Sequence, residues 1–573
     1  MRKLGKHFIV ILTALGLVIN SVPAIVDTNS VTASAASNLS FRETLTDGES
    51  SSTDSDHDYI NVGRWTTTVK SYLEETENGY CRVEAIAKNN YVVVEEYSKD
   101  YRQLSQKKIP YELPIFGGYF LGDNYRFLVF GQENRDEDES TEVIRIVKYD
   151  KSWNQLGTLS ISDINTTVPF DAGSLRMAES GGMLYIHTCH EMYKSSDGRN
   201  HQANMTFVMN QETMEVTQSW YGVMNIGYGY VSHSFNQFVL TDGDYLYRLD
   251  HGDAYPRAVV LTKADTNNIT SCANKKILSI CGTIGANDTG VEVGGFEMAG
   301  GQLVVAGNSV SQDDEESYNA SGVKNVFIAS TDTDLESTET TWLTGYTERD
   351  KTEVGNPHLV KVSEEELYVL WEELNSSDGY NVKIAQINNM GELQGRVYTL
   401  KARLSDCAPV FTSGGEIAWY VTFQYVPDLF HIAPDKLEEY EKMEEPASGT
   451  GGTTGDNKPG NGTGGTTGGS KNKTSKVTAP SKVQKVTAKN KKNKTVTLSW
   501  KKVSGAKGYQ FQYALNKKFT KSKKSKLTTK TKVTIKKLKK KKTYYFRVRA
   551  YKLNGKTKVY GKWSSVKKVK IKK

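Results

Sequence analysis

The chain has 573 residues, 24% of them charged, and is long enough for several domains with sizeable hydrophobic cores. Its net charge of +7 conceals an asymmetry. Residues 471–573 carry 37 Lys and Arg and no Asp or Glu, which leaves 36 basic against 66 acidic residues elsewhere. This excludes a uniformly charged protein and predicts charged partners for the basic end. The five cysteines include no CxxC metal pair and no disulfide framework, although Cys272 and Cys281 are close enough to close one loop.

The N-terminus has the features of an export signal. Arg2 and Lys3 precede the apolar run 8–19, and Ala33-Ser34-Ala35 has the small-residue pattern of a cleavage site. We therefore predict a signal peptide over residues 1–35 and a secreted protein, either extracellular or associated with the cell wall. An uncleaved membrane anchor is the alternative, but the run is shorter than the ~18 residues of a span, and the mature chain has no other candidate.

A Ser-, Thr- and Asp-rich stretch, residues 36–58, is predicted to be a flexible leader. Asp54–Asp58 resembles the start of a calcium loop, but Tyr59 stands where the sharp-turn glycine belongs. No cofactor is predicted from this stretch, and calcium or another divalent metal remains a weak alternative.

The next part of the chain repeats one hairpin pattern. Residues 177–186, Met-Ala-Glu-Ser-Gly-Gly-Met-Leu-Tyr-Ile, predict a strand, a Gly-Gly turn and a second strand. The same spacing, one apolar residue followed by another seven positions later, recurs at Phe120 and Phe127, Val239 and Leu246, Phe296 and Leu303, Val360 and Leu367, Val410 and Ile417, and more weakly Ala85 and Val92. Such a period is the signature of a repeat architecture.

Each repeat continues with a second β run, for example residues 143–149 and 325–329. Two hairpins per repeat give a four-stranded antiparallel sheet, so residues 59–425 resemble a β-propeller, which protects the edges of its sheets by radial repetition. The predicted fold class is all-β, with seven blades, or six if the weak first copy is only a closing strand. A pair of β-sandwiches or a β-solenoid is the alternative.

Residues 426–477 are predicted to connect two domains. They begin with an acidic segment that contains a short helix at 435–443 and continue as a Gly/Thr-rich flexible linker.

The C-terminal region, residues 478–573, has the alternating apolar pattern of a small β-sandwich. Pro480 opens its first strand, Trp500 is the expected core tryptophan, and Leu538 lies six residues before Tyr544. On these residues the region resembles a fibronectin type III domain. The resemblance implies a seven-stranded sandwich in which Tyr544 forms the tyrosine corner.

Polar residues that follow the hairpins suggest a site on the propeller. Six of the nine histidines fall in loops predicted to share one face: His187, His190, His201, His233, His251 and His358. Ligand-binding candidates are His187, His190, Asp197, His201, His233, Asn236, Asp250, His251, Asp253 and Arg257. Together they could bind a metal or an anionic sugar, or act as acid and base. Singly they are ordinary turn residues, so no catalytic residue and no metal ligand is assigned.

Other predicted loops are acidic, at 133–142, 312–316 and Glu372-Glu373. They predict a solvated rim, with calcium or a cationic partner as the alternative.

The Lys-rich type III domain predicts attraction to polyanions, with Lys539, Lys540, Lys541 and Lys542 as a concentrated patch. The predicted function is a secreted binding or adhesion protein. Its propeller face would bind a glycan or protein, and its basic domain would bind an anionic cell-wall polymer or acidic polysaccharide. The alternatives are a carbohydrate-active enzyme, glycosidase or lyase, with a type III accessory module, and a basic domain that is only a soluble spacer.

Overall fold

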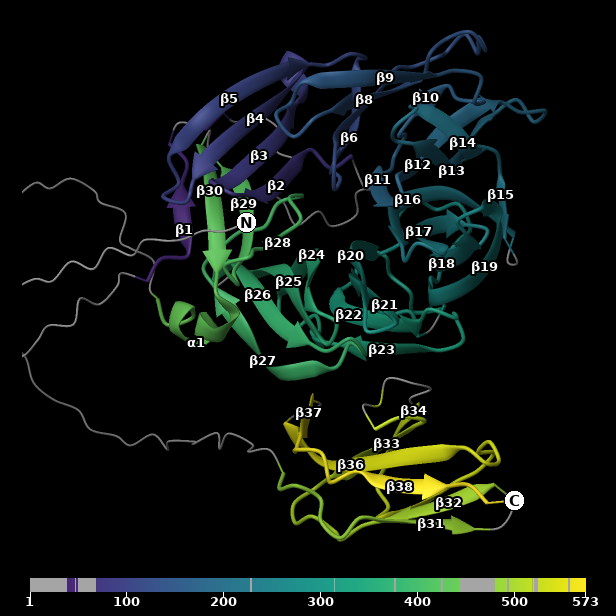
Figure 1. Cartoon of the computed structure of the whole chain (residues 1–573), viewed down its shortest axis with the longest axis vertical. Coiled ribbons are helices and arrows are strands. Elements are labelled where there is room, and N and C mark those ends of the chain that lie inside the picture. The colour runs from purple at the N-terminus through teal and green to yellow at the C-terminus, as the bar shows by residue number, and fades with distance from the viewer. Residues whose placement is uncertain are drawn as a thin grey trace, which may run out of the picture. The chain divides into compact units, whose positions relative to one another are not determined.

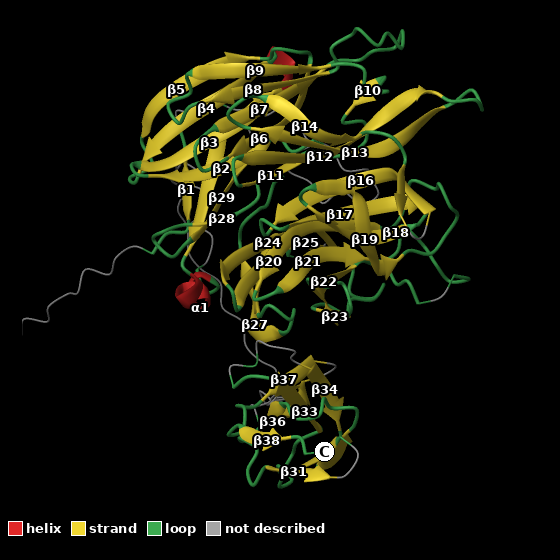
Figure 2. Ribbon diagram, turned by 45° about the vertical axis from the view of Figure 1, so that its right-hand side comes forward, coloured by secondary structure: helices red, strands yellow, loops and turns green. Residues whose placement is uncertain are grey.

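A computed structural model of the chain describes residues 39–46, 48–49, 68–226, 229–313, 315–375, 378–423, 426–443, 480–491, 494–517, 519, 524–554 and 557–572. The predicted signal peptide, the calcium-like sequence at 54–59 and the Gly/Thr-rich linker lie outside these residues. Strands dominate the described structure, which confirms the all-β prediction (Figures 1 and 2). Helical elements are α1 (Leu437–Tyr440), inside the predicted helix, and the short turns η2 (Ala87–Asn89) and η3 (Pro434–Lys436). Among the described residues, no helix has the length and hydropathy needed to cross a membrane.

Between residues 42 and 432, seven antiparallel sheets follow one another along the chain. The first sheet contains β2 (Ser71–Thr76), β3 (Gly79–Ile86), β4 (Tyr91–Ser98) and β5 (Gln103–Pro110). The second contains β6 (Ile115–Leu121), β7 (Arg126–Gly131), β8 (Ile144–Tyr149) and β9 (Gln155–Ile161). The third contains β10 (Val168–Pro169), β11 (Arg176–Ser180), β12 (Met183–Lys194), β13 (Asn200–Asn210) and β14 (Glu215–Trp220).

The remaining four sheets repeat this plan. The fourth contains β15 (Met224–Ile226), β16 (Gly229–Thr241), β17 (Tyr245–Ala254), β18 (Ala258–Asp265) and β19 (Asn268–Ser279). The fifth contains β20 (Val291–Ala299), β21 (Gln302–Ser309), β22 (Asn325–Asp332) and β23 (Thr338–Trp342). The sixth contains β24 (Thr352–Ser363), β25 (Glu366–Asn375), β26 (Gly379–Ile387) and β27 (Leu393–Leu400). The seventh contains β28 (Val410–Phe411), β29 (Ile417–Phe423), β30 (Val426–Ile432) and β1 (Arg42–Thr44).

The seven sheets form a ring, the arrangement of a β-propeller (Figure 1). The first strand of a repeated hairpin contacts the corresponding strand of the next sheet: β11 contacts β16, β16 contacts β20, β20 contacts β24, and β24 contacts β28. β28 in turn contacts β2 of the first sheet. The N-terminal strand β1 belongs to the seventh sheet, because Arg42 on β1 pairs with Phe430 on β30. Two segments assigned from sequence to the flexible leader and the acidic connection, residues 42–44 and 426–432, are therefore strands of the ring.

The repeated hairpins are present, but their registers differ. Gly181 and Gly182 adopt positive φ angles of 57° and 77° in the turn between β11 and β12, which only glycine adopts readily. The weak copy at Ala85 and Val92 is a correctly paired contact, yet it joins β3 to β4 rather than the first two strands of its sheet. The repeated seven-residue spacing therefore predicted one hairpin in every sheet, but it did not predict which two strands of the sheet form that hairpin.

The hydrophobic core lies mainly between consecutive sheets. One cluster joins the second and third sheets through Phe127, Ile146, Leu184 and Phe207, and another joins the fifth and sixth through Trp371. Because neighbouring sheets cover both faces of each sheet, the sequences of its strands contain continuous apolar runs as well as alternating apolar and polar residues.

The C-terminal domain is a two-sheet sandwich. One sheet contains β31 (Thr487–Lys491), β32 (Thr495–Ser499) and β35 (Lys532–Ile535); the other contains β33 (Gly508–Ala514), β34 (Lys524–Thr528), β36 (Thr543–Asn554), β37 (Thr557–Tyr560) and β38 (Lys567–Lys570). Trp500 is buried in the core, as predicted. The Tyr544 hydroxyl accepts a hydrogen bond of 3.2 Å from the Lys539 backbone N–H, which is the predicted tyrosine corner.

Candidate functional site

Most of the sequence-predicted site residues lie in strands, not in loops. His187 and His190 belong to β12, His201 to β13, His233 and Asn236 to β16, His358 to β24, and Asp250, His251 and Asp253 to β17. The prediction of loops was wrong because these strands continue beyond the apolar hairpin core and carry polar residues that neighbouring sheets cover. The side chain of His233 lies outside the described structure.

A buried polar network joins the third and fourth sheets. His187 Nε2 lies 3.0 Å from Asp250 Oδ1, and both side chains are fully buried. Asn204 donates a 2.8 Å hydrogen bond to the same carboxylate oxygen. On its other side, His187 Nδ1 lies 2.9 Å from Thr206 Oγ1. The Asp250 carboxylate is thus the common partner of the His187 ring and the Asn204 amide, in keeping with the rule that buried polar groups are hydrogen-bonded.

The network continues through Ser174, Asn236 and Gln237. Ser174 donates a hydrogen bond of 2.9 Å to Asn236 Oδ1, and Gln237 Oε1 accepts one of 2.9 Å from the Ser174 backbone. These hydrogen bonds hold the third sheet against the fourth, so in the described structure the three residues have a structural role inside the propeller.

Two other histidines are kept neutral. Burial lowers the pKa of His190 and of His251 to about 3 each. His251 Nε2 lies 2.8 Å from Thr289 Oγ1, and His190 Nδ1 lies 2.6 Å from Thr166 Oγ1. Neither ring carries charge at neutral pH, so neither supplies a cation for an anionic sugar.

Arg257 anchors loops. Its guanidinium donates hydrogen bonds to the carbonyl oxygens of Cys281, at 2.7 Å, and Asp288, at 2.8 Å, and to the Tyr318 hydroxyl, at 3.2 Å. Asp253 is fully buried, and its backbone carbonyl accepts a 3.0 Å hydrogen bond from the Gly285 N–H. Arg257 therefore holds the segments after β19 and β21 together.

Asp197 and His201 form an exposed pair at the end of the β12–β13 hairpin. His201 Nε2 lies 2.9 Å from Asp197 Oδ2. Hydrogen bonds from the Ser195 hydroxyl, the Arg199 backbone and His201 lower the pKa of Asp197 to about 2. The predicted residues whose side chains the structure describes thus divide between buried polar contacts, loop anchors and this surface pair.

The described residues contain no group of three or more His, Cys, Asp and Glu side chains arranged to hold a metal ion. Glu372 and Glu373, predicted in an acidic loop, lie in β25, and the Arg403 guanidinium pairs with Glu372 at 2.8 Å. All five cysteines are free thiols.

One acidic group on β20 has a pKa near neutrality. Burial raises the pKa of Glu297 from 4.5 to about 7, against the opposing effect of Lys361. Glu297 loses its proton at a lower pH in the unfolded chain than in the folded chain. The free energy of unfolding is therefore highest at low pH and declines as the pH rises to about 7.

We expect Glu297→Gln to be more stable than the parent at pH 8 by about 2 kcal/mol, and equally stable at pH 4. Urea unfolding at both pH values measures this, with Glu215→Gln, at an exposed position of β14, as the control. An equal pH dependence in parent and Glu297→Gln would contradict the assignment.

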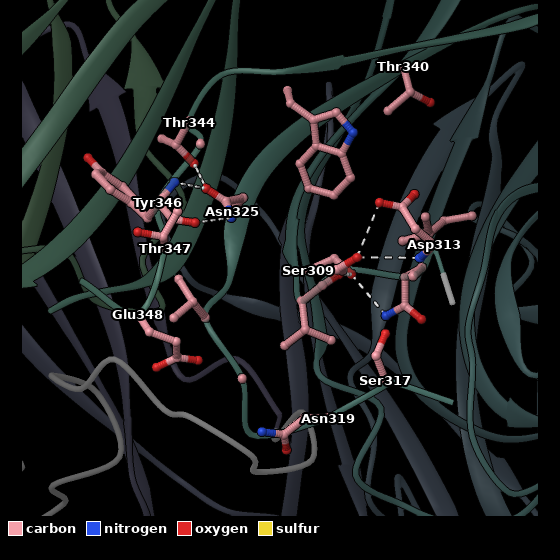
Figure 3. A pocket seen from close by; sticks show the side chains of 18 of the residues that line it. Ser309, Asp313, Ser317, Asn319, Asn325, Thr340, Thr344, Tyr346, Thr347 and Glu348 are labelled. Atoms are coloured by element: carbon pink, nitrogen blue, oxygen red, sulfur yellow. Dashed lines mark hydrogen bonds between the residues drawn. The ribbon is translucent and has the colours of Figure 1, made fainter. Parts of the chain in front are cut away.

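A large cleft lies elsewhere on the ring, between the fourth and fifth sheets (Figure 3). Its volume is about 1090 Å³, and its walls come from the end of β19, the segment after β21 and the segment around β23. Asp313 and Glu348 lie on opposite walls, and hydroxyl and amide side chains lie between them (Figure 3). The lining includes Ser309, Ser317, Asn319, Asn325, Thr340 and Thr347.

Internal hydrogen bonds fix both walls of this cleft. Asn325 Oδ1 accepts a hydrogen bond of 3.0 Å from the Thr344 hydroxyl, and Asn325 Nδ2 donates one of 3.1 Å to the Tyr346 carbonyl. On the other wall, Gln312 Oε1 accepts a 2.8 Å hydrogen bond from the Cys281 backbone, and Glu315 accepts one of 2.7 Å from Gly282. The cleft is therefore held open by the same segments that Arg257 anchors.

Sequence reasoning missed this cleft. Residues 312–316 were predicted only as an acidic loop, and no role was predicted for Trp342. Trp342 ends β23 and is 45% exposed, an unusual position for a large aromatic residue. The signal was present in the run Thr340-Thr341-Trp342, but the rest of the lining includes residues between 277 and 323, which lie 19 to 65 positions before Trp342.

The predicted lysine patch is larger than the sequence indicated. Lys536, Lys537 and Lys539–Lys542 are all exposed around the buried Leu538. The Leu538 N–H donates to the Lys494 carbonyl, and Lys541 and Lys542 exchange backbone hydrogen bonds with Ile571. These bonds bring three segments together at one end of the sandwich. We call the nine exposed lysines there the corner patch: Lys494, Lys536, Lys537, Lys539, Lys540, Lys541, Lys542, Lys570 and Lys572.

Comparisons with known proteins agree with the fold of the C-terminal domain. Residues 481–567 match the family model "Fibronectin type III domain", so this part of the chain is a type III domain. No curated protein sequence matches the chain.

Parts of this chain are also similar to solved structures, among them the following three. A human fibronectin type III domain is 21% identical over 16% of this chain and 72% of its own, with a TM-score of 0.14. A subtype N10 neuraminidase-like protein of A/little yellow-shouldered bat/Guatemala is 9% identical over 57% of this chain and 98% of its own, with a TM-score of 0.33. A xylan β-1,4-xylosidase from Bacillus halodurans C-125 is 9% identical over 80% of this chain and 91% of its own, with a TM-score of 0.26.

Proposed function

We propose that this chain is a secreted, surface-associated binding protein. Its type III domain attaches electrostatically to an anionic polymer of the cell envelope or an acidic polysaccharide, and its propeller presents a binding cleft. The observation that carries the proposal is the corner patch, nine exposed lysines gathered from three segments of a domain that has no acidic residue.

Electrostatic attraction explains why such a patch favours polyanions. Each lysine that approaches an anionic polymer releases condensed counterions, so many weak contacts add up to substantial affinity without a shaped pocket. The ligand is therefore defined by charge density, and phosphate- or carboxylate-bearing polymers both qualify.

Removing the basic domain tests the proposal. We expect the full chain, without its signal peptide, to be retained on immobilised polyglycerol phosphate and on polygalacturonate at low salt. A chain that ends at residue 446 should pass through both. Immobilised dextran, a neutral polymer, controls for non-specific adsorption. Equal retention of the two chains on the anionic polymers would overturn the proposal.

A further inference from the structure

The cleft between the fourth and fifth sheets has the dimensions of a ligand site. Its volume of about 1090 Å³ lies slightly above the usual range of small-molecule pockets. A second hollow of about 540 Å³ shares Gly322, Val323 and Glu348 with it, so the two form a continuous surface depression. A depression of this length suits a chain of several linked units better than a single small molecule.

Trp342 provides an aromatic platform in the cleft. One side of its ring packs edge-to-face on the fully buried Phe327, with centroids 5.6 Å apart and an interplanar angle of 62°. The side chain is nevertheless 45% exposed. A tryptophan that is fixed from one side and open on the other loses little conformational entropy when an apolar face stacks on it.

The remaining lining selects the chemistry of the ligand. Hydroxyl, amide and carboxylate groups line both walls, with Asn319, Thr340 and Thr347 among the residues that contribute them (Figure 3). Among the described residues that line the larger hollow, none is Lys, Arg or His, whereas the smaller hollow includes Lys324 and Lys351. Asp313 and Glu348 give the larger hollow a negative field instead, which disfavours polyanions.

We propose that this cleft binds a neutral glycan chain. A pyranose ring has an apolar face that stacks on Trp342 and a rim of hydroxyl groups that hydrogen-bond with carboxylates, amides and hydroxyls. The proposal rests on the propeller acting as the ligand-binding part of the proposed function, but it does not depend on the attachment by the corner patch. The two parts of the protein then bind ligands of opposite character, a neutral glycan and a polyanion.

Calorimetric titration of the full chain with four probes tests this site: cellohexaose, xylohexaose, mannohexaose and the hexamer of N-acetylglucosamine. We expect at least one to bind with a Kd below about 1 mM. Trp342→Ala should weaken that binding about tenfold or more, whereas Trp342→Phe should retain most of it. Tyr245→Ala, which removes an exposed aromatic residue outside the cleft (38% exposed), is the matched control and should leave the Kd unchanged.

A second variant guards against a folding defect in Trp342→Ala. Thr340 is an exposed residue of the cleft wall, and Thr340→Arg fills the space without disturbing the core. It should abolish hexasaccharide binding at an unchanged thermal unfolding temperature. The proposal is overturned if no neutral hexasaccharide binds, if neither cleft variant changes the Kd, or if an oligogalacturonate or a lysine-rich peptide binds the cleft in preference to every neutral probe.

Failure of this inference is distinguishable from failure of the proposed attachment. Replacing Lys539–Lys542 with glutamine should reduce retention on polyglycerol phosphate and leave hexasaccharide affinity intact. Trp342→Ala should do the opposite. A loss of both activities in either variant would overturn the assignment of glycan binding to the propeller cleft.

Discussion

Replacing Arg82 with methionine should lower the free energy of unfolding of the propeller by about 3–5 kcal/mol, because it leaves two carboxylates buried without their cation. Arg82, Glu84 and Glu95 are all fully buried. The guanidinium lies 2.7 Å from Glu95 Oε2 and also pairs with Glu84. Burial raises the pKa of Glu95, but Arg82 and the Tyr97 hydroxyl outweigh that effect and hold it below its ordinary value.

The position of this cluster explains the expected size of the effect. Arg82 lies on β3 of the first sheet, and its guanidinium lies 5.2 Å from the ring centroid of Tyr420 on β29 of the seventh. It therefore stabilises the junction at which the ring closes.

Chemical denaturation measures the change in unfolding free energy. Arg135→Met is the matched control: its side chain is 59% exposed and pairs with Glu133 in a surface loop, so the change should stay below about 1 kcal/mol. If Arg82→Met were as stable as the control, the buried charges would have to be compensated by groups other than Arg82.

Replacing Lys539, Lys540, Lys541 and Lys542 together with glutamine should weaken binding to polyglycerol phosphate about 10- to 100-fold near 0.1 M salt. Each lost lysine–phosphate contact lowers the slope of log K against log salt by about 1. These lysines form the centre of the corner patch, so they should make more contacts than lysines elsewhere on the domain.

A charge-matched variant separates the patch from the overall charge. Lys482, Lys485, Lys501 and Lys502 are exposed, and Lys501 follows the end of β32, whereas Lys494 of the corner patch precedes its start. Glutamine at these four positions removes the same charge from the opposite end of the sandwich. We expect a smaller loss of affinity from this control, measured by the same binding assay. Equal losses would mean that charge alone, not the patch, governs binding.

The architecture followed from the sequence because its signals are local. A hairpin is specified by a short turn such as Gly181-Gly182 and by apolar residues on either side, and repetition of that pattern indicated the successive sheets. In the same way Trp500, Leu538 and Tyr544 were enough to indicate the sandwich.

The site did not follow from the sequence, because its signals are not local. His187 and Asp250 are 63 positions apart and become partners only when two sheets pack together. Polar residues in a run that also contains apolar ones look like a loop until the neighbouring sheet covers them. The cleft around Trp342 likewise depends on three segments whose proximity is set by packing between sheets.

The most direct test of the account is a salt titration of the binding of the full chain to polyglycerol phosphate. Attachment through the corner patch predicts that log K falls linearly with log salt, with a slope of several units that reflects the number of lysine contacts. Affinity that stays constant from about 0.05 to 0.5 M salt would contradict an electrostatic attachment and, with it, the proposed role of the type III domain.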